Sequence, residues 1–369
     1  MKNVKNVRKL RTVRRLRTVR RLRIEKKFMM RYRRYLKLVG WIFLILIVIR
    51  VFFYQVMDVG SFHMASTLLP GDRVIVNKYR AGLRLPISII GLPGANAPYA
   101  DGIRLPYLRL PALKKIRRQE VVVFNNPSGS DKPIDRKRLM ISRIIGIPTD
   151  TVMIQDKQVS VNNKIVIPPE LARSEYRVVT SGQPIGNEFL RKYDIEKPRV
   201  VADIGIFDVD LGKAAAGILE KSGGTRNIRE TRQFMGDASA DYYPTSNFFK
   251  WNRDQYGPFR VPAKGMTVGI EIRTIDFYRD LIETQEGHDV MVDFAGVHID
   301  GKIATSYTFE KDYYFVLSDN RDNPDDSRKL GFIPADHIIG VTKRIIWSHQ
   351  TEFDYVRKFH PGRILKKIR

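Results

Sequence analysis

The chain has 369 residues, no cysteine and a formal net charge of +26. The lack of cysteine excludes disulfides and thiolate metal sites, and the length allows a membrane anchor plus a sizeable two-lobed core. The charge is uneven, because residues 1–38 hold 17 Lys/Arg against Glu25 alone, whereas the remainder holds 48 Lys/Arg against 38 acids. A basic segment beside an apolar one indicates anionic lipid as partner and not nucleic acid.

Residues 1–37 are expected to form a basic cytoplasmic tail. One hexad occurs three times, at 7–12, 13–18 and 19–24. A period of six does not build a continuous apolar helical stripe. Two interpretations stay open: a polybasic clamp on the inner leaflet, or a low-complexity tail upstream of a start at Met29 or Met30.

Residues 38–55 are predicted to form one transmembrane anchor. The run LVGWIFLILIVIRVFFY spans residues 38–54 and would rise about 25 Å as a helix. Arg50 lies near its outer end, where its side chain can reach the headgroups. Bulky aromatic residues follow the run, which indicates an uncleaved anchor. The preceding basic residues predict a single-pass protein of the bacterial inner membrane, with a cytoplasmic N-terminus and a periplasmic soluble part.

The soluble chain is predicted to be mostly β. The clearest strands are Arg73–Asn77, Val121–Phe124, Met140–Ile147 and Tyr313–Leu317, because β-branched and aromatic residues alternate or run continuously there. The Pro/Gly-rich passage Leu85–Pro111 indicates an extended surface arm.

Two segments, 151–167 and 289–305, share a pattern of strand, turn, strand, turn and strand, with Asn162-Asn163 and Asp300-Gly301 as tight turns. The residues between them predict an inserted lobe at 168–288, with short helical patches at Leu211–Ser222 and Phe277–Glu286. The core would then comprise residues 56–167 and 289–369.

The most informative stretch is Tyr313–Arg328, where an apolar strand leads into the loop SDNRDNPDDSR. Such a density of charged hydrogen-bonding groups directly after a strand indicates a fixed polar network. This stretch closely resembles the last signature of the type I signal peptidases, and three further blocks extend the resemblance in the family's order. They are Ser61–Lys78, Gln119–Phe124 and Met140–Asp150, and the last block continues to Pro334.

The resemblance implies a β-rich catalytic core with an inserted second lobe, and amide hydrolysis by a serine with a neutral lysine as base. It also implies that the exported chain binds as an added strand. However, the position of the nucleophile is His63, directly before Met64, and the position of the base is Ser142. Ser61 stands where a hydroxyl helps to stabilise the oxyanion. Two further departures are Ser318, for a glycine of the family, and Pro324, for the serine that positions the base. The supporting residues Arg143, Asp319, Asp326, Ser327 and Arg328 persist, and Asn320 and Arg321 of the same loop are further candidates for supporting the site.

Three interpretations of the substituted site are open. Ser61 could attack after a local slip, but the base is then missing, since Lys137 lies five residues from Ser142 and faces the other side of the strand. Ser142 and His63 could form an exchanged nucleophile–base pair, but the oxyanion donors are arranged around the first block. The third interpretation, which we favour, is that His63 fills the site and the chain is a pseudoenzyme.

We therefore expect a membrane-anchored member of the signal peptidase I family in protein export, with no cofactor and no metal. Its expected partners are membrane lipid, signal peptides of exported proteins and an active paralogue. The competing functions are an active serine endopeptidase with the Ser142–His63 pair, and a lipid- or nucleic-acid-binding protein that uses its basic N-terminus.

Overall fold

The structure, a computed structural model, describes residues 32–85, 106–128, 132–169, 172–203, 205–237, 241–246, 248–351, 357–359 and 361–368. Residues Met1–Phe53 and Tyr54–Arg369 form two compact units. The three basic hexads and residues 86–105 of the expected arm lie outside the described residues.

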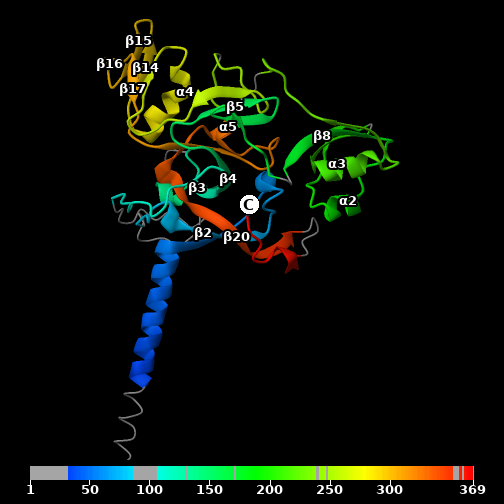
Figure 1. The fold of residues 1–369 in the computed structure, drawn as a ribbon, viewed down its shortest axis with the longest axis horizontal. Helices are drawn as coiled ribbons and strands as arrows, with labels where there is room; N and C mark the ends of the chain where they lie inside the picture. The colour runs from blue at the N-terminus through cyan, green and yellow to red at the C-terminus, as the bar shows by residue number, and fades with distance from the viewer. Residues whose placement is uncertain are drawn as a thin grey trace, which may run out of the picture. The chain divides into compact units, whose positions relative to one another are not determined.

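Residues 32–53, the described part of the first unit, form a helical segment, shown in blue in Figure 1. Residues 32–48 are α-helical, and the π-helical turn η1 (Ile49–Phe53) follows. Apolar side chains such as Trp41 and Phe43 are exposed along it. Among the described residues, no helix is both long enough and apolar enough to cross a membrane, so the anchor predicted at 38–55 is not confirmed.

The main sheet of the second unit is antiparallel. Its order is β1 (Tyr54–Asp58), β2 (Asp72–Asn77), β20 (Ile338–Thr351), β3 (Val121–Asn125), β4 (Leu139–Gly146), β18 (Tyr313–Leu317) and β19 (Ile333–Pro334), and β21 (Arg357–Phe359) pairs with β20. The four strands predicted from the sequence are confirmed, with ends shifted by one residue at most. All five residues of β3 are buried, because apolar clusters cover both faces of the sheet.

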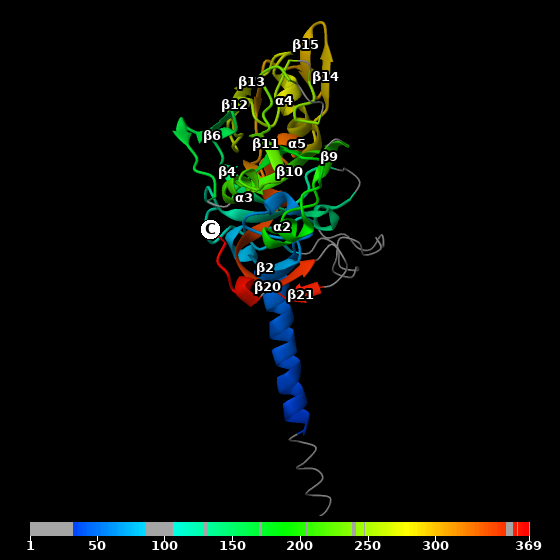
Figure 2. The same cartoon turned by 90° about the vertical axis from the view of Figure 1, so that its right-hand side faces the viewer.

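A second sheet consists of β12 (Tyr256–Arg260), β5 (Thr151–Gln155), β6 (Gln158–Val161) and β7 (Lys164–Ile165). The similar segment forms β14 (Val290–Asp293), β15 (Gly296–Ile299) and β16 (Lys302–Ile303), as predicted. Asn162 and Asn163 turn with φ of 50° and 62°, which asparagine tolerates better than most residues. The strands β14–β16 lie at one end of this unit and β20 lies toward the other in both views (Figures 1 and 2).

A third sheet, which we call the lobe sheet, lies between β7 and β12 in the sequence. Its order is β11 (Thr225–Glu230), β8 (Arg173–Thr180), β10 (Ile206–Gly212) and β9 (Arg199–Ala202). The helices α2 (Asn187–Lys192) and α3 (Lys213–Glu220) accompany it, and together they enclose an apolar cluster around Val178, Val209 and Leu211. The predicted helical patch at Leu211–Ser222 corresponds to α3.

Short elements complete the second unit. The second predicted patch, Phe277–Glu286, corresponds to α4 (Ile275–Asp280) and the π-helical η5 (Leu281–Gln285). The strands β13 (Thr267–Gly269) and β17 (Ser306–Thr308) pair with each other. The remaining short helices are η2 (Phe62–Met64), η3 (Lys78–Arg80), η4 (Ile134–Arg136), α5 (Ser327–Leu330), η6 (Ala335–His337) and η7 (Pro361–Arg363). The proposed boundaries at residues 168 and 288 stay a prediction, since the second unit is continuous from Tyr54 onward.

Candidate functional site

His63 lies on the 3₁₀ turn η2 and is held by the loop that follows β18. The amide of Asn320 donates to the His63 carbonyl at 2.9 Å. The ring Nδ1–H donates to the carbonyl of Asn323 at 2.9 Å, and Nε2 lies 3.5 Å from Oδ2 of Asp325. The side chain is 24% exposed. Both ring nitrogens therefore face groups of the same loop.

Ser142 lies in the middle of β4, opposite Val122 of β3. Its side chain is completely buried, and its hydroxyl donates to the carbonyl of Ile141 at 2.7 Å. Alternation along the strand places it on the same face as Met140 and Ile144, which belong to an apolar cluster. Across the described ranges, no hydrogen bond joins the Ser142 hydroxyl to the His63 ring.

Arg143 and Asp319 form the buried ion pair that the resemblance implies. Nε and Nη2 of Arg143 each lie 2.7 Å from one carboxylate oxygen of Asp319, so the contact is bidentate. Thr67 donates to Asp319 Oδ2 at 2.5 Å and accepts from Arg143 at 3.3 Å. Arg143 also donates to the carbonyl of Gln119 at 2.8 Å. These bonds connect the first, second, third and fourth sequence blocks.

Asp326, near the C-terminal end of the same loop, accepts several hydrogen bonds. Its carboxylate accepts from the amide of Ser318 at 2.8 Å and from the amide of Arg328 at 3.0 Å, which caps α5. The Arg328 side chain donates to it at 2.8 Å. Burial acts to raise the pKa of Asp326, but Arg328 and the two amides hold that pKa below its usual range. Ser327 accepts from the amide of Val316 at 3.0 Å, which fixes the start of α5 to β18.

The remaining candidate residues occupy the same neighbourhood. Ser61 is half-buried and precedes η2 without capping it, and Met64 is fully buried. The Ser318 hydroxyl accepts from the amide of Asp325 at 3.4 Å. Asn320 donates to Asp210 at 2.8 Å. Pro324 is buried. The burial of the Arg321 side chain lowers its pKa to about 10, although the nearby carboxylate of Asp319 acts to raise it.

Sequence analysis missed three residues that contact this site. Asn323 and Asp325, which engage the His63 ring, stand on either side of Pro324 in the fourth block. Thr67 stands between His63 and Gly71-Asp72 in the first block. All three residues lie inside the sequence blocks, which is the signal that could have indicated them. No pattern in the sequence indicates that the ring of His63 contacts the carbonyl of Asn323.

In the described residues, the Ser142 hydroxyl and the His63 ring are not arranged as a nucleophile and its base. A serine hydroxyl attacks only when a base within hydrogen-bond reach takes its proton and the attacking oxygen meets the substrate. The Ser142 hydroxyl is buried and bonded to its own strand, and the His63 ring is bonded to the loop. Two buried ion pairs, Arg143–Asp319 and Arg328–Asp326, lie in the same region.

Comparison with known proteins identifies relatives along most of the chain. The family model described as "Signal peptidase, peptidase S26" matches residues 32–241 and 278–347. The protein "Signal peptidase I" of Buchnera aphidicola subsp. Baizongia pistaciae is 23% identical over 308 residues, which cover 84% of this chain and 74% of that protein. The protein of the same name from Buchnera aphidicola subsp. Schizaphis graminum is 21% identical over 308 residues, covering 84% and 72%. That of Pseudomonas aeruginosa is 30% identical over 123 residues, covering 33% and 35%.

Proposed function

Since the chain belongs to the signal peptidase family, peptidase S26, we propose that it acts in signal-peptide processing as a member that binds signal peptides without cleaving them. Family membership supports the role in signal-peptide processing. The proposed loss of cleavage rests on His63 and Ser142, which stand where the resemblance implies the nucleophile and the base.

The observation that carries the proposal is the state of Ser142. Its hydroxyl is fully buried among apolar side chains and donates to the carbonyl of Ile141. The proton of this hydroxyl is therefore donated to a backbone carbonyl and not to a base, and burial keeps the oxygen away from a peptide carbonyl. The exchanged pair would require the hydroxyl and the His63 ring to meet, and each group has other partners in the structure.

Peptide binding is the second part of the proposal. The residues Arg143, Asp319, Asp326 and Arg328, which the resemblance places around the site, form two buried, bidentate ion pairs. Main-chain hydrogen bonds to an added strand supply affinity without a catalytic group. We infer that a signal peptide can bind by such pairing even where it is not cut.

Membrane attachment is the third part. The first unit exposes a run of large apolar side chains, including Trp41, Phe43 and Ile45, and 17 Lys/Arg precede or flank it within residues 1–38. An apolar segment beside a basic one suits a bilayer surface with anionic lipid. We propose that this unit attaches the protein to the cytoplasmic membrane.

The test combines cleavage and binding on one purified, detergent-solubilised protein. The wild type, Ser142→Ala and His63→Ala variants are incubated with an exported precursor, and the binding of a fluorescent signal peptide is measured by anisotropy. We expect no cleavage by any of the three and peptide binding by all of them, because neither side chain is needed for main-chain pairing.

Turnover by the wild type that disappears in both variants would overturn the proposal in favour of the exchanged Ser142–His63 pair. Turnover that survives both changes would indicate a different nucleophile. If cleavage and binding are both absent, the proposed peptide-binding role is wrong. An active family member in parallel shows that the precursor is competent.

A further inference from the structure

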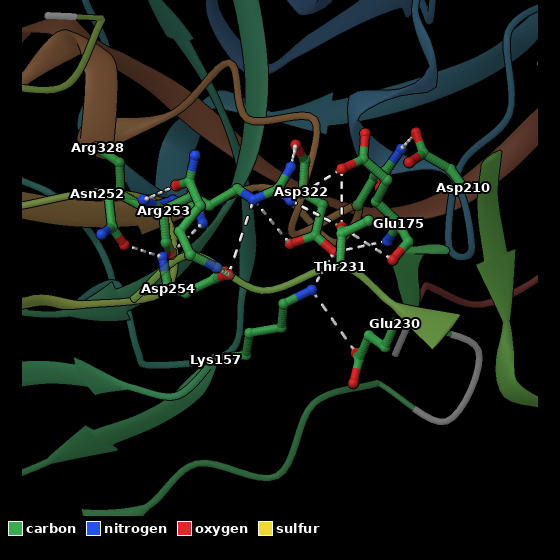
Figure 3. Close-up of polar contacts among 12 residues, drawn as sticks. Lys157, Glu175, Asp210, Glu230, Thr231, Asn252, Arg253, Asp254, Asp322 and Arg328 are labelled. Atoms are coloured by element: carbon green, nitrogen blue, oxygen red, sulfur yellow. Dashed lines mark hydrogen bonds and ion pairs between the residues drawn. The ribbon is translucent and has the colours of Figure 1, made fainter. Parts of the chain in front are cut away.

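A buried network of charges joins the lobe sheet to the loop that holds His63. Figure 3 shows Lys157 and Arg253 converging on the carboxylates of Asp322 and Glu175. Asp322 belongs to the loop after β18, Glu175 to β8 of the lobe sheet, and Lys157 to the turn between β5 and β6. Segments that are far apart in the sequence therefore meet at one point.

Asp322 lies at the centre of this network. Its Oδ2 accepts from the ammonium group of Lys157 at 2.6 Å and from the backbone amide of Glu175 at 2.6 Å. The Asp322 side chain is 1% exposed and that of Lys157 is 12% exposed. The two bonds connect the loop to the second sheet and to the lobe sheet through a single carboxylate oxygen.

Arg253, which precedes β12, makes the second set of contacts. Its Nη2 donates to Oε2 of Glu175 and to the hydroxyl of Thr231, each at 2.8 Å, and its Nη1 donates to the carbonyl of Asp322 at 3.2 Å. Thr231 in turn donates to Glu175 Oε2 at 2.8 Å. The Arg253 carbonyl accepts from Arg328 at 3.0 Å, which extends the network to the Asp326–Arg328 pair.

We propose that these residues form a latch through which the lobe sheet positions the loop that carries the His63 contacts. We define the latch as Lys157, Glu175, Thr231, Arg253 and Asp322. Asp322 is directly followed by Asn323, whose carbonyl accepts from the His63 ring, and Asp325 faces the other ring nitrogen. Fixing Asp322 from two sheets therefore fixes the surroundings of His63, and Lys157 and Arg253 are positioning residues.

Because the latch is buried, losing one of its charges costs more free energy than losing a charge at the surface. A buried carboxylate that loses one cationic partner keeps its cost of desolvation with less compensating attraction, which favours opening of the loop. A surface ion pair would have little such effect. In Lys157→Met, Arg253 would remain as the second cation, since its Nε lies 3.8 Å from Asp322 Oδ1. The latch gives the lobe sheet a role at the site, although Glu175 of that sheet and Thr231, which directly follows it, lie outside the four sequence blocks. This role does not depend on whether the chain cleaves its peptide.

The test compares Lys157→Met with Lys164→Met in the full chain. Lys164 is an exposed lysine on β7 of the same sheet as Lys157, so its replacement serves as the matched control. Amide hydrogen exchange is followed by mass spectrometry. We expect Lys157→Met to accelerate exchange about tenfold in segments 173–180 and 318–326, and to leave 121–125 in the main sheet unchanged.

A second readout reports on His63 itself. Exchange of the imidazole C2 hydrogen, measured in the peptide that contains His63, should change in Lys157→Met and stay unchanged for the distant His298. A purely structural role for Lys157 would accelerate amide exchange in all segments and affect both histidines. That result, or the absence of any difference from Lys164→Met, would overturn the latch.

Two further variants cover the case in which Lys157→Met does not fold. Thr231→Val removes one donor to Glu175 at nearly constant volume, and we expect the same pattern of exchange with a smaller increase. Lys157→Met combined with Asp322→Asn removes both charges, so we expect it to recover part of the lost protection. A uniform effect of Thr231→Val, or a double variant less protected than Lys157→Met alone, would contradict the proposal.

Discussion

At the scale of single residues, the site combines a buried ion pair with His63 and Ser142, which stand at the positions where the resemblance implies a nucleophile and a base. Arg143 and Asp319 remain paired at 2.7 Å, and both side chains are almost fully buried. Breaking such a pair on one side typically costs 3–5 kcal/mol, roughly. The His63 ring and the Ser142 hydroxyl instead donate single hydrogen bonds to backbone carbonyls. The proposed loss of the nucleophile and base is therefore compatible with a stable fold.

This difference predicts that activity can be restored by a few substitutions. The combination His63→Ser, Ser142→Lys, Ser318→Gly and Pro324→Ser replaces all four departures from the family pattern. A lysine at 142 would enter the apolar face of β4 beside Ile144, where burial favours its neutral, basic form. We expect precursor cleavage at least about a hundredfold above that of any single variant, because nucleophile and base act as a unit.

The measurement is a single-turnover cleavage assay with the four single variants as controls. Circular dichroism and thermal unfolding establish that the combined variant is folded. The contradicting outcome is a combined variant that folds and binds signal peptide but cleaves no faster than the single variants. That result would show that the buried ion pairs are not enough to make the site competent for cleavage.

At the scale of elements, the long strand β20 approaches β2 so closely at Gly340 that a side chain would not fit there. A Cβ placed on Gly340 would lie 2.5 Å from the carbonyl oxygen of Asn77 and 2.8 Å from its carbonyl carbon, both in the backbone of β2. Backbone atoms do not move aside as the end of a flexible side chain does. The close approach of β2 and β20 therefore requires glycine at this position.

Gly340→Ala should lower the free energy of unfolding by about 1–3 kcal/mol, because β20 must separate from β2 to admit the methyl group. The matched control is Gly217→Ala in α3, where nothing lies within 4 Å of the added Cβ. That change should raise stability by up to about 1 kcal/mol, since alanine favours helix over glycine. Urea unfolding followed by circular dichroism measures both. Effects of equal sign would contradict the steric argument.

The sequence predicted the elements whose pattern is local. The strand Tyr313–Leu317 was predicted with its observed ends, and the Asn162-Asn163 turn followed from its residue types. The four strands of the lobe sheet were missed, because a strand such as Thr225–Glu230 is largely polar and alternates weakly. Its place is set by pairing with β8, which a single sequence does not display.

The candidate site likewise has residues that the sequence indicated and contacts that it did not. Motif order in the sequence located His63, Ser142 and the Arg143–Asp319 pair, because the blocks are contiguous. The hydrogen bonds of the His63 ring and of the latch around Asp322 were missed, because they join residues that are 22 to 260 positions apart in the sequence. Lys157 and Arg253 carry no local signal that distinguishes them from solvated surface cations.

At the scale of the whole molecule, the positive charge is divided unequally between its parts. Residues 1–38 hold 17 of the 65 Lys/Arg and one of the 39 acids. In the second unit, many of the cations are neutralised in pairs, such as Arg118 with Asp150 and Arg80 with Glu120. The N-terminal segment is therefore the part of the chain with the largest uncompensated charge.

Deletion of residues 1–28 should accordingly weaken binding to anionic vesicles far more than binding to neutral ones. Each basic residue near an anionic surface contributes about 1 kcal/mol, so we expect at least a tenfold loss of affinity for vesicles containing phosphatidylglycerol, and a weaker salt dependence. The control neutralises Lys114, Lys115 and Arg117, an exposed basic cluster of the second unit, and should change vesicle binding little. Co-sedimentation measures both, with duplex DNA as a competitor. Unchanged vesicle binding after the deletion, or displacement of the full chain from vesicles by equimolar DNA, would show that the tail does not select lipid.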